Sequence, residues 1–284
     1  MHWPFKVHGI YNRRADIHGL YSGQQQGGIA TPSGVPGIFI FTGHGASKHG
    51  YADKLMADGS YRYTGEGQVG DMAMVRGNRA IRDHAINGKD LLVFEKAGSG
   101  APVRFVGLFA CAGWDIERQL DTVQAEREAI VFTLVPIEAL RDEIEDAEDI
   151  EEPPIQNLAA LRNLALAAAA PEQQEPESAR KNIYRRSRAV RNYVLARAGG
   201  ICEACAAPAP FTTTSGKPYL EPHHVRRLSD GGPDHPAHVV AVCPNCHRRA
   251  HHSADGAAFN SDLSTKAVEI EALVCLITIR ATEG

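Results

Sequence analysis

The sequence predicts an α+β chain made of two compact units, a β-rich N-terminal domain and a C-terminal domain organised around metal ligands. Three observations lead to this prediction. Residues 1–140 alternate short apolar runs with glycine-rich turns, residues 141–178 are acidic and contain prolines, and residues 179–284 hold two Cys-x-x-Cys pairs and a cluster of histidines. The length of 284 residues exceeds that of an ordinary single domain and also favours two units.

The N-terminal unit contains four apolar runs of the length of a strand. They are rich in Ile, Val, Leu and Phe, and glycines lie between them, which is typical of strands and their turns. The runs are residues 37–41, 90–94, 103–109 and 129–134. We therefore expect a β-rich domain over residues 1–140.

Residues 141–178 form the predicted linker. Asp142 to Glu152 is a run of mainly acidic residues, and it ends at Pro153 and Pro154. Apolar residues at 158, 161, 164 and 168 then recur at helical spacing, which predicts one amphipathic helix inside the linker.

The charge of the chain is distributed unevenly. The formal net charge is only −4, and this value alone argues against a polyanionic partner. The acidic linker, however, masks an excess of Lys and Arg in residues 179–284. The chain shows neither a secretory signal pattern nor an uninterrupted apolar stretch of membrane-spanning length, so we expect a cytoplasmic protein without a membrane partner.

Four of the six cysteines are arranged as two Cys-x-x-Cys pairs. Cys202 and Cys205 form the first pair, and Cys243 and Cys246 form the second. The two cysteines of such a pair lie in a tight turn and can both bind the same tetrahedral ion. Two pairs together supply four thiolates, which are a common ligand set for structural zinc. We therefore predict one structural Zn²⁺ site, with disulfides or free thiols as the weaker alternative.

The same region contains more histidines than a zinc site needs. His223 and His224 are adjacent in a predicted strand, where neighbouring side chains point to opposite faces. His247 and His251 are four residues apart, which places both rings on one face of a helix. A second structural zinc is the alternative, but adjacent histidines are not a usual spacing for it.

This pattern resembles the HNH, or ββα-metal, nuclease motif in its zinc-stapled form. The resemblance covers about residues 180–255 and rests on Leu-Glu-Pro-His-His-Val at 220–225, Leu-Ser-Asp-Gly-Gly at 228–232 and Val-Cys-Pro-Asn-Cys-His at 242–247. It implies that His223, His247 and His251 hold a catalytic divalent cation such as Mg²⁺ or Mn²⁺. It also implies that His224 is the general base that deprotonates the attacking water. His238 falls where the family usually has Asn, and we expect it to orient the base or to brace its loop.

Three segments of the N-terminal unit resemble the SRA (SET and RING associated) family, which binds 5-methylcytosine in DNA. They are residues 50–53, 59–67 and 77–81. The resemblance implies a barrel of the SRA/PUA type with a pocket in which Tyr51 and Tyr63 sandwich a base that is rotated out of the duplex.

The resemblance also implies a carboxylate that accepts a hydrogen bond from the exocyclic amine of the cytosine. Asp53 is our candidate, although well-known eukaryotic members have this Asp one residue further on, where this chain has Lys54. Asp58 is the alternative.

Several arginines are candidates for contacts with DNA phosphates, with an ordinary solvated surface as the alternative. One lies in the last SRA-like segment, and the others lie in a basic, helix-compatible segment that starts at Arg180. They are Arg79, Arg185, Arg186 and Arg188.

Together the two resemblances imply an SRA-HNH restriction endonuclease of type IV, a bacterial defence enzyme that acts on double-stranded DNA containing modified cytosine. The sequence leaves open whether 5-methylcytosine or 5-hydroxymethylcytosine is bound, and whether the protein forms a homodimer. Two other functions also stay open. One is a non-catalytic reader of modified DNA with a zinc-stabilised DNA-binding domain, and the other is an HNH nuclease that ignores modification.

Overall fold

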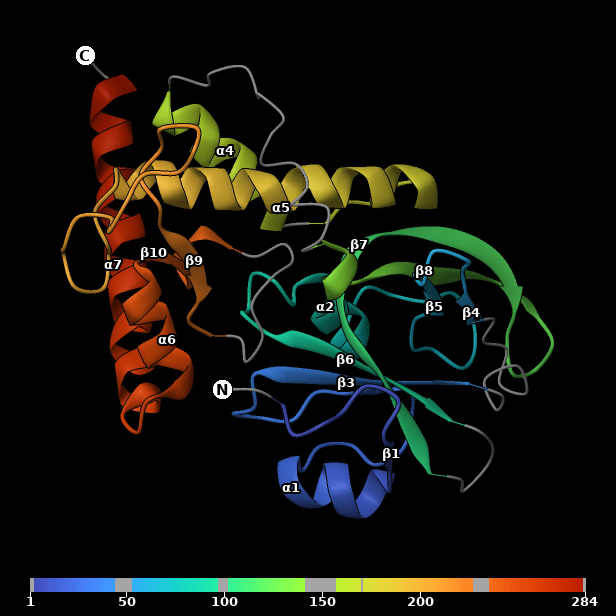
Figure 1. The fold of residues 1–284 in the computed structure, drawn as a ribbon. Helices are drawn as coiled ribbons and strands as arrows, with labels where there is room; N and C mark the ends of the chain where they lie inside the picture. Colours follow the sequence, from blue (N-terminus) through green and yellow to red (C-terminus); the bar gives the residue numbers. More distant parts are fainter. Residues whose placement is uncertain are drawn as a thin grey trace.

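The computed structural model describes residues 3–43, 53–96, 102–140, 157–169, 171–226 and 235–282. A sheet-based N-terminal unit lies beside a mainly helical C-terminal unit, and the long helix α5 (Pro176–Ala198) extends across both of them (Figure 1). The predicted α+β class is confirmed. Among the described residues, no helix combines the length and the apolar character that crossing a membrane requires.

The described strands of the N-terminal unit form one sheet in the order β2, β3, β6, β7, β8, β5 and β4, and β1 pairs with β7. All neighbours are antiparallel except β3 and β6, which are parallel. The strands are β1 (Ile10–Tyr11), β2 (Ile29–Ala30), β3 (Gly37–Gly43), β4 (Lys54–Leu55), β5 (Tyr61–Thr64), β6 (Asp90–Lys96), β7 (Val103–Leu120) and β8 (Glu126–Pro136). The four strands predicted from apolar runs are confirmed as β3, β6, β7 and β8.

Among the described residues the sheet is open and does not form the closed barrel that the family resemblance implies. β2 and β4 lie at the two ends of the strand order, and no pairing joins them among the described residues. Each is only two residues long, which is too short for a ladder of hydrogen bonds that would close a barrel. A register shift between Cys111 and Gly113 marks a bulge in the long strand β7, and bulges of this kind bend a strand.

Both faces of the sheet are covered, so its central strands are apolar at almost every position. In β3, Ile40 points to one face and Phe41 to the other, and each joins a separate buried cluster. Helix α2 (Arg76–Arg82) contributes Ile81 to the first cluster, and the short helix η1 (Arg13–His18) contributes Ile17 to the second. The three-residue helix α1 (Gly19–Tyr21) follows η1 directly.

The C-terminal unit packs a two-stranded antiparallel sheet against helices. The sheet consists of β9 (Glu221–His224) and β10 (Val239–Val242), and the short helix η4 (Pro236–His238) leads into β10. The other helices are α4 (Leu158–Ala169), α6 (Pro244–His252) and α7 (Gly256–Thr282). The strand and the helix predicted to carry the histidines are confirmed as β9 and α6.

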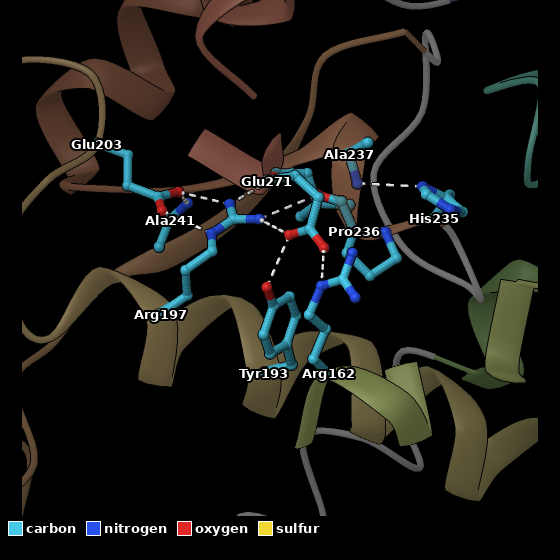
Figure 2. Close-up of polar contacts among 10 residues, drawn as sticks. Arg162, Tyr193, Arg197, Glu203, His235, Pro236, Ala237, Ala241 and Glu271 are labelled. Carbon is cyan, nitrogen blue, oxygen red and sulfur yellow. Dashed lines mark hydrogen bonds and ion pairs between the residues drawn. The ribbon is translucent and has the colours of Figure 1, made fainter. Parts of the chain in front are cut away.

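A buried network of charged groups joins α4, α5 and α7 (Figure 2). The Glu271 carboxylate of α7 accepts hydrogen bonds from Arg162 at 2.6 Å, from the Tyr193 hydroxyl at 2.7 Å and from Arg197 at 3.1 Å. Arg197, whose side chain is 1% exposed, also forms an ion pair with Glu203 at 2.9 Å. Burial lowers the pKa of Arg197, but the hydrogen bonds and the charge of Glu203 more than offset this and raise it. The guanidinium therefore stays charged inside the protein.

Helix α5 belongs to the cores of both units. Its N-terminal half places Ala179 and Ile183 against β7 and β8 in one buried cluster, and its C-terminal half places Tyr193 in the C-terminal core. The segment before α5 also joins the sheet, because Trp114 donates a backbone hydrogen bond to Glu172 and accepts one from Gln174. The two units are thus packed together along α5.

The boundaries 1–140, 141–178 and 179–284 stay a prediction. The acidic run from Asp142 to Glu152 lies outside the described residues. The amphipathic helix predicted inside the linker corresponds to α4, and its Ala165 is buried in the C-terminal core. This part of the predicted linker therefore packs as a component of the C-terminal unit.

Candidate functional site

The four paired cysteines converge between α5 and α6. The left-handed residues Gly199 and Gly200 end α5 and turn the chain into the first pair, while Cys243 is the N-cap of α6 and Cys246 lies in its first turn. The four sulfur atoms lie within 4.8 Å of one another. The donor set and its spacing fit one tetrahedral metal ion.

The environment of Cys202 favours a thiolate. Burial raises the pKa of the Cys202 thiol, but backbone N–H groups of Cys205, Cys243 and Ala204 donate to its sulfur and lower the pKa to about 7. The bond from the Cys243 N–H is 3.2 Å long. Since a metal ligand must be deprotonated, these donors prepare the sulfur for coordination.

The three predicted ligands of the catalytic cation also come together. His223 lies on β9, His247 and His251 lie on one face of α6, and their ligand atoms are within 4.8 Å of one another. The Nε2 atoms of His247 and His251 are 3.2 Å apart. The spacing of these ligand atoms fits one divalent cation bound by imidazole nitrogens.

Two further side chains orient this cluster. The Glu221 carboxylate lies 2.6 Å from His247 Nδ1, so this nitrogen carries the proton and Nε2 is left to bind a cation. The amide oxygen of Asn260 lies 2.7 Å from His223 Nε2, while its amide nitrogen donates to the Val225 carbonyl at 2.6 Å. The proton of His223 is therefore on Nε2, and Nδ1 is the nitrogen that could bind a cation.

Neither Glu221 nor Asn260 was predicted as a site residue from the sequence pattern. Glu221 stands two residues before His223 in β9, so the alternation of side chains in a strand could have placed it on the same face. Asn260 lies 37 residues after His223, on α7, and no local signal in the sequence links the two.

His224 and His238, the predicted base and its brace, lie on facing segments. His224 pairs with Val239 in the β9–β10 register, and the backbone N–H of Val225 donates to the His238 carbonyl at 2.9 Å. His224 is 7% exposed and His238 is 6% exposed. The imidazole of His238, however, is hydrogen-bonded to the carbonyl of Ile86 in the N-terminal unit at 2.6 Å.

The predicted base pocket is described only in part, because Tyr51 lies outside the described residues. Tyr63 lies on β5, and its ring is buried in the core cluster of the sheet. Asp53 accepts hydrogen bonds from the Thr42 hydroxyl at 2.7 Å and from the Thr64 N–H at 2.9 Å. Burial raises the pKa of the Asp53 carboxyl, and the two hydrogen bonds oppose this effect.

Asp58, the alternative carboxylate, has other partners. It accepts hydrogen bonds from the Ser60 N–H and hydroxyl, and it forms an ion pair with Arg180 of α5 at 3.3 Å. Its slight burial raises its pKa, but the bonds from Ser60 and the charge of Arg180 lower it overall. Asp53 thus bonds Thr64 of β5, the residue after Tyr63, whereas Asp58 bonds Ser60 directly before that strand.

Two cations lie over the ring of Phe41 in β3, and the sequence pattern does not indicate either of them. The Arg13 guanidinium lies 3.7 Å above the ring of Phe41, and Lys96 Nζ lies 6.0 Å from the same ring centroid. Arg13 donates to the carbonyl of Gly27, next to Gly28, where an added Cβ would lie 2.5 Å from the Tyr63 hydroxyl. Burial lowers the pKa of Arg13 to about 10 and also lowers that of Lys96.

The predicted phosphate-contacting arginines lie on two helices. Arg79 is exposed on α2, and Arg185 is exposed on α5. Arg188 is half-buried on α5, and the side chain of Arg186 lies outside the described part of the chain.

Both units of the chain match families of known proteins. Residues 8–152 match the family model described as ScoMcrA-like, SRA domain, and residues 202–253 match the model described as HNH endonuclease. Over 87 residues the chain is 45% identical to the type IV methyl-directed restriction enzyme EcoKMcrA of Escherichia coli (strain K12), a match that covers 28% of this chain and 31% of that protein. The chain thus matches less than a third of this relative's length.

Two solved structures are also similar. The type IV phosphorothioation-dependent restriction endonuclease ScoMcrA gives a TM-score of 0.41 at 23% identity, over 93% of this chain and 60% of the other. The SUVH5 SRA domain in complex with methylated CHH DNA gives a TM-score of 0.36 at 20% identity, over 48% of this chain and 92% of the other.

Fold, site and matches define a class of protein in which an SRA domain precedes an HNH endonuclease domain that carries a four-cysteine cluster. Since the SRA model matches just over half of its residues, the chain belongs to the ScoMcrA-like SRA domain family.

Proposed function

We propose that this protein is a modification-dependent DNA endonuclease. Its SRA domain binds double-stranded DNA that contains 5-methylcytosine or 5-hydroxymethylcytosine, and its HNH domain hydrolyses a phosphodiester bond nearby. The observation that carries the proposal is the convergence of His223, His247 and His251 beside His224, in one chain with an SRA domain.

In this proposal the site residues divide the chemistry between them. His223, His247 and His251 hold a divalent cation such as Mg²⁺ or Mn²⁺, which when bound supplies Lewis acidity at the scissile phosphate. His224 takes a proton from water as the water oxygen attacks phosphorus and the bond to the 3′ oxygen breaks. The four cysteines hold a separate, structural Zn²⁺.

Recognition of the base is assigned to the N-terminal pocket. Tyr51 and Tyr63 stack on a flipped cytosine, and the Asp53 carboxylate accepts a hydrogen bond from its exocyclic amine. Each carboxylate oxygen can accept a second hydrogen bond, so the contacts with Thr42 and Thr64 are compatible with this role. Arg79, Arg185, Arg186 and Arg188 contact phosphates.

The test is cleavage of matched plasmids that carry unmodified, methylated or hydroxymethylated cytosine, in the presence of Mg²⁺ or Mn²⁺. We expect cleavage of modified plasmids and little cleavage of the unmodified one. Binding of modified DNA without any cleavage would support a non-catalytic reader instead. Equal cleavage of all plasmids would support a nuclease that ignores modification.

A further inference from the structure

The side chain of His238 crosses the boundary between the two units. Its Nε2 lies 2.6 Å from the carbonyl oxygen of Ile86, and because a carbonyl only accepts, Nε2 carries the proton. Its Nδ1 is buried and has no hydrogen-bond partner among the described residues. Among the described residues, the imidazole of His238 is therefore hydrogen-bonded to the SRA domain and not to the histidine cluster.

The turn that contains Ile86 is firmly fixed to the SRA sheet. His84, which is fully buried, shares a hydrogen bond of 2.9 Å between its Nδ1 and the Lys89 carbonyl, and its Nε2 accepts one from the Cys111 N–H of β7 at 3.1 Å. The backbone N–H of Lys89 in turn donates to the His84 carbonyl at 2.8 Å. The Ile86 carbonyl is thus presented at a defined place relative to the sheet.

Close packing beside the hydrogen bond between His238 and Ile86 adds a second contact between the units. Gly88 has a φ of +57°, and a Cβ added to it would lie 2.5 Å from Cβ of Arg226 in the C-terminal unit. Only glycine allows this turn to approach so near. Arg226 is two residues after His224, so the turn lies directly against the end of β9.

The backbone of His238 is held equally firmly on the nuclease side. Arg197 donates to the carbonyl of Pro236 at 3.1 Å (Figure 2). It also donates to the carbonyl of Val239 at 2.8 Å, so it contacts the backbone on either side of His238. The His238 carbonyl accepts the Val225 N–H, and Val239 pairs with His224. These contacts do not use the imidazole of His238, so the backbone beside the candidate general base is held in place when only the side-chain contact with Ile86 is removed.

Helix α2 connects the same turn with the predicted base pocket. Asn78 of α2 accepts a hydrogen bond from the Glu66 N–H at 2.7 Å, and Glu66 accepts one from the Gly77 N–H at 2.7 Å. Glu66 is two residues after Thr64, whose N–H donates to Asp53. One short helix thus separates the pocket from the turn that binds His238.

We propose that His238 is a positioning residue that fixes the HNH active site on the SRA domain, so that the cleavage of modified DNA depends on its contact with Ile86. This inference rests on the proposed function. Cleavage of modified DNA requires the phosphodiester bond and the active site to meet while the reader holds the base. Cleavage of unmodified DNA does not use the reader and does not need this contact.

The test compares His238→Asn with His238→Gln. The amide nitrogen of Gln lies about as far along the side chain as Nε2 of His and can donate to Ile86, whereas the shorter Asn cannot reach it. We expect His238→Asn to lower the ratio of the cleavage rates of methylated and unmethylated plasmid by about fivefold, as for the loss of one ordinary hydrogen bond. The cut positions should also spread along the DNA, and His238→Gln should retain both properties of the wild type.

Hydrogen exchange of the full-length protein without DNA gives an independent measurement. In His238→Asn, the amides of residues 85–89 and of Val225 should exchange faster by about the same factor, and in His238→Gln they should not. If the wild-type protein cleaves modified and unmodified plasmid equally, the proposed function is refuted. The hydrogen-exchange measurement would still show whether the side chain of His238 connects the two units. Equal losses of rate on both plasmids, or unchanged exchange in residues 85–89, would overturn the inference.

Discussion

At the scale of single residues, the adjacent histidines of β9 should have separable roles. His224→Ala should lower the cleavage rate by about a hundredfold or more and leave binding of modified DNA intact, because a general base adds little to affinity in the ground state. His247→Ala should also stop cleavage, but through weaker cation binding, so raised Mn²⁺ should partly restore it. Cleavage rates over a series of Mn²⁺ concentrations test this. Strong cutting by His224→Ala would remove His224 as the base.

The carboxylate of Glu221 should set the cation affinity of the site. Replacement by Gln removes the charged acceptor that orients His247, and losses of this kind weaken metal binding by about 10 to 100-fold. We expect Glu221→Gln to need correspondingly more Mn²⁺ for half-maximal cleavage and to approach the wild-type rate at saturation. Tyr219→Phe is the matched control, since the Tyr219 hydroxyl contacts the other oxygen of the same carboxylate at 3.0 Å. An unchanged Mn²⁺ requirement in Glu221→Gln would contradict this role.

Asp53 gives a prediction about specificity and pH. Asp53→Asn should retain the fold and lose most of the preference for modified over unmodified DNA, because an amide offers one acceptor in place of two. Burial raises the pKa of Asp53, so acidification should protonate it at a higher pH than an ordinary Asp. The wild-type preference should then fall as the pH is lowered through this raised pKa. Binding titrations of methylated and unmethylated duplexes over a pH series test this, and a preference that Asp53→Asn retains would exclude Asp53 from the pocket.

At the scale of elements, the four cysteines should determine the stability of the junction between α5 and α6. We expect purified protein to contain about one zinc ion, and Cys202→Ala to lose it together with much of the stability of the C-terminal unit, because a structural zinc contributes folding energy directly. Metal analysis and thermal unfolding measure the two effects. Folded protein with active nuclease and no zinc would refute the assignment.

Elements with strong local signals were predictable from the sequence. β3, β6, β7 and β8 are long and apolar because both faces of the sheet are covered, and the histidine spacing in α6 follows from the helical repeat. The strands β1, β2 and β4 are two residues long, and so short a segment carries no periodicity. The resemblance implied a closed barrel, but it could not indicate that the end strands are too short to close one.

At the scale of the whole molecule, the relative placement of the two units was not predictable. The sequence suggested an acidic, helical linker, but α4 packs into the C-terminal core and α5 packs on both units. The contact of His238 with Ile86 joins residues 152 positions apart, and nothing in the local pattern around either residue indicates it. The motif match indicated His238 as a residue that orients the base or braces its loop, and this role stays a prediction. The contact of its imidazole with Ile86 came only from the fold.

This packing predicts that cuts occur at a fixed distance from the modified cytosine. Ile183 of α5 is 1% exposed and packs against β7 and β8. Ile183→Glu places a charge in this interface and should separate the units. The variant should keep its zinc and its affinity for modified DNA, but its cuts should spread over many positions, because each unit then moves independently on the DNA.

Mapping the cut ends on a duplex with one methylated site measures the distribution. Lys181→Gln is the matched control, because Lys181 lies on the same helix with its side chain 74% exposed and contacts only Glu177 among the ion pairs described. Its cuts should stay as narrowly distributed as those of the wild type. If wild-type cuts are already scattered, the packing along α5 does not persist on DNA, and the reader then acts only by raising the local concentration of the nuclease.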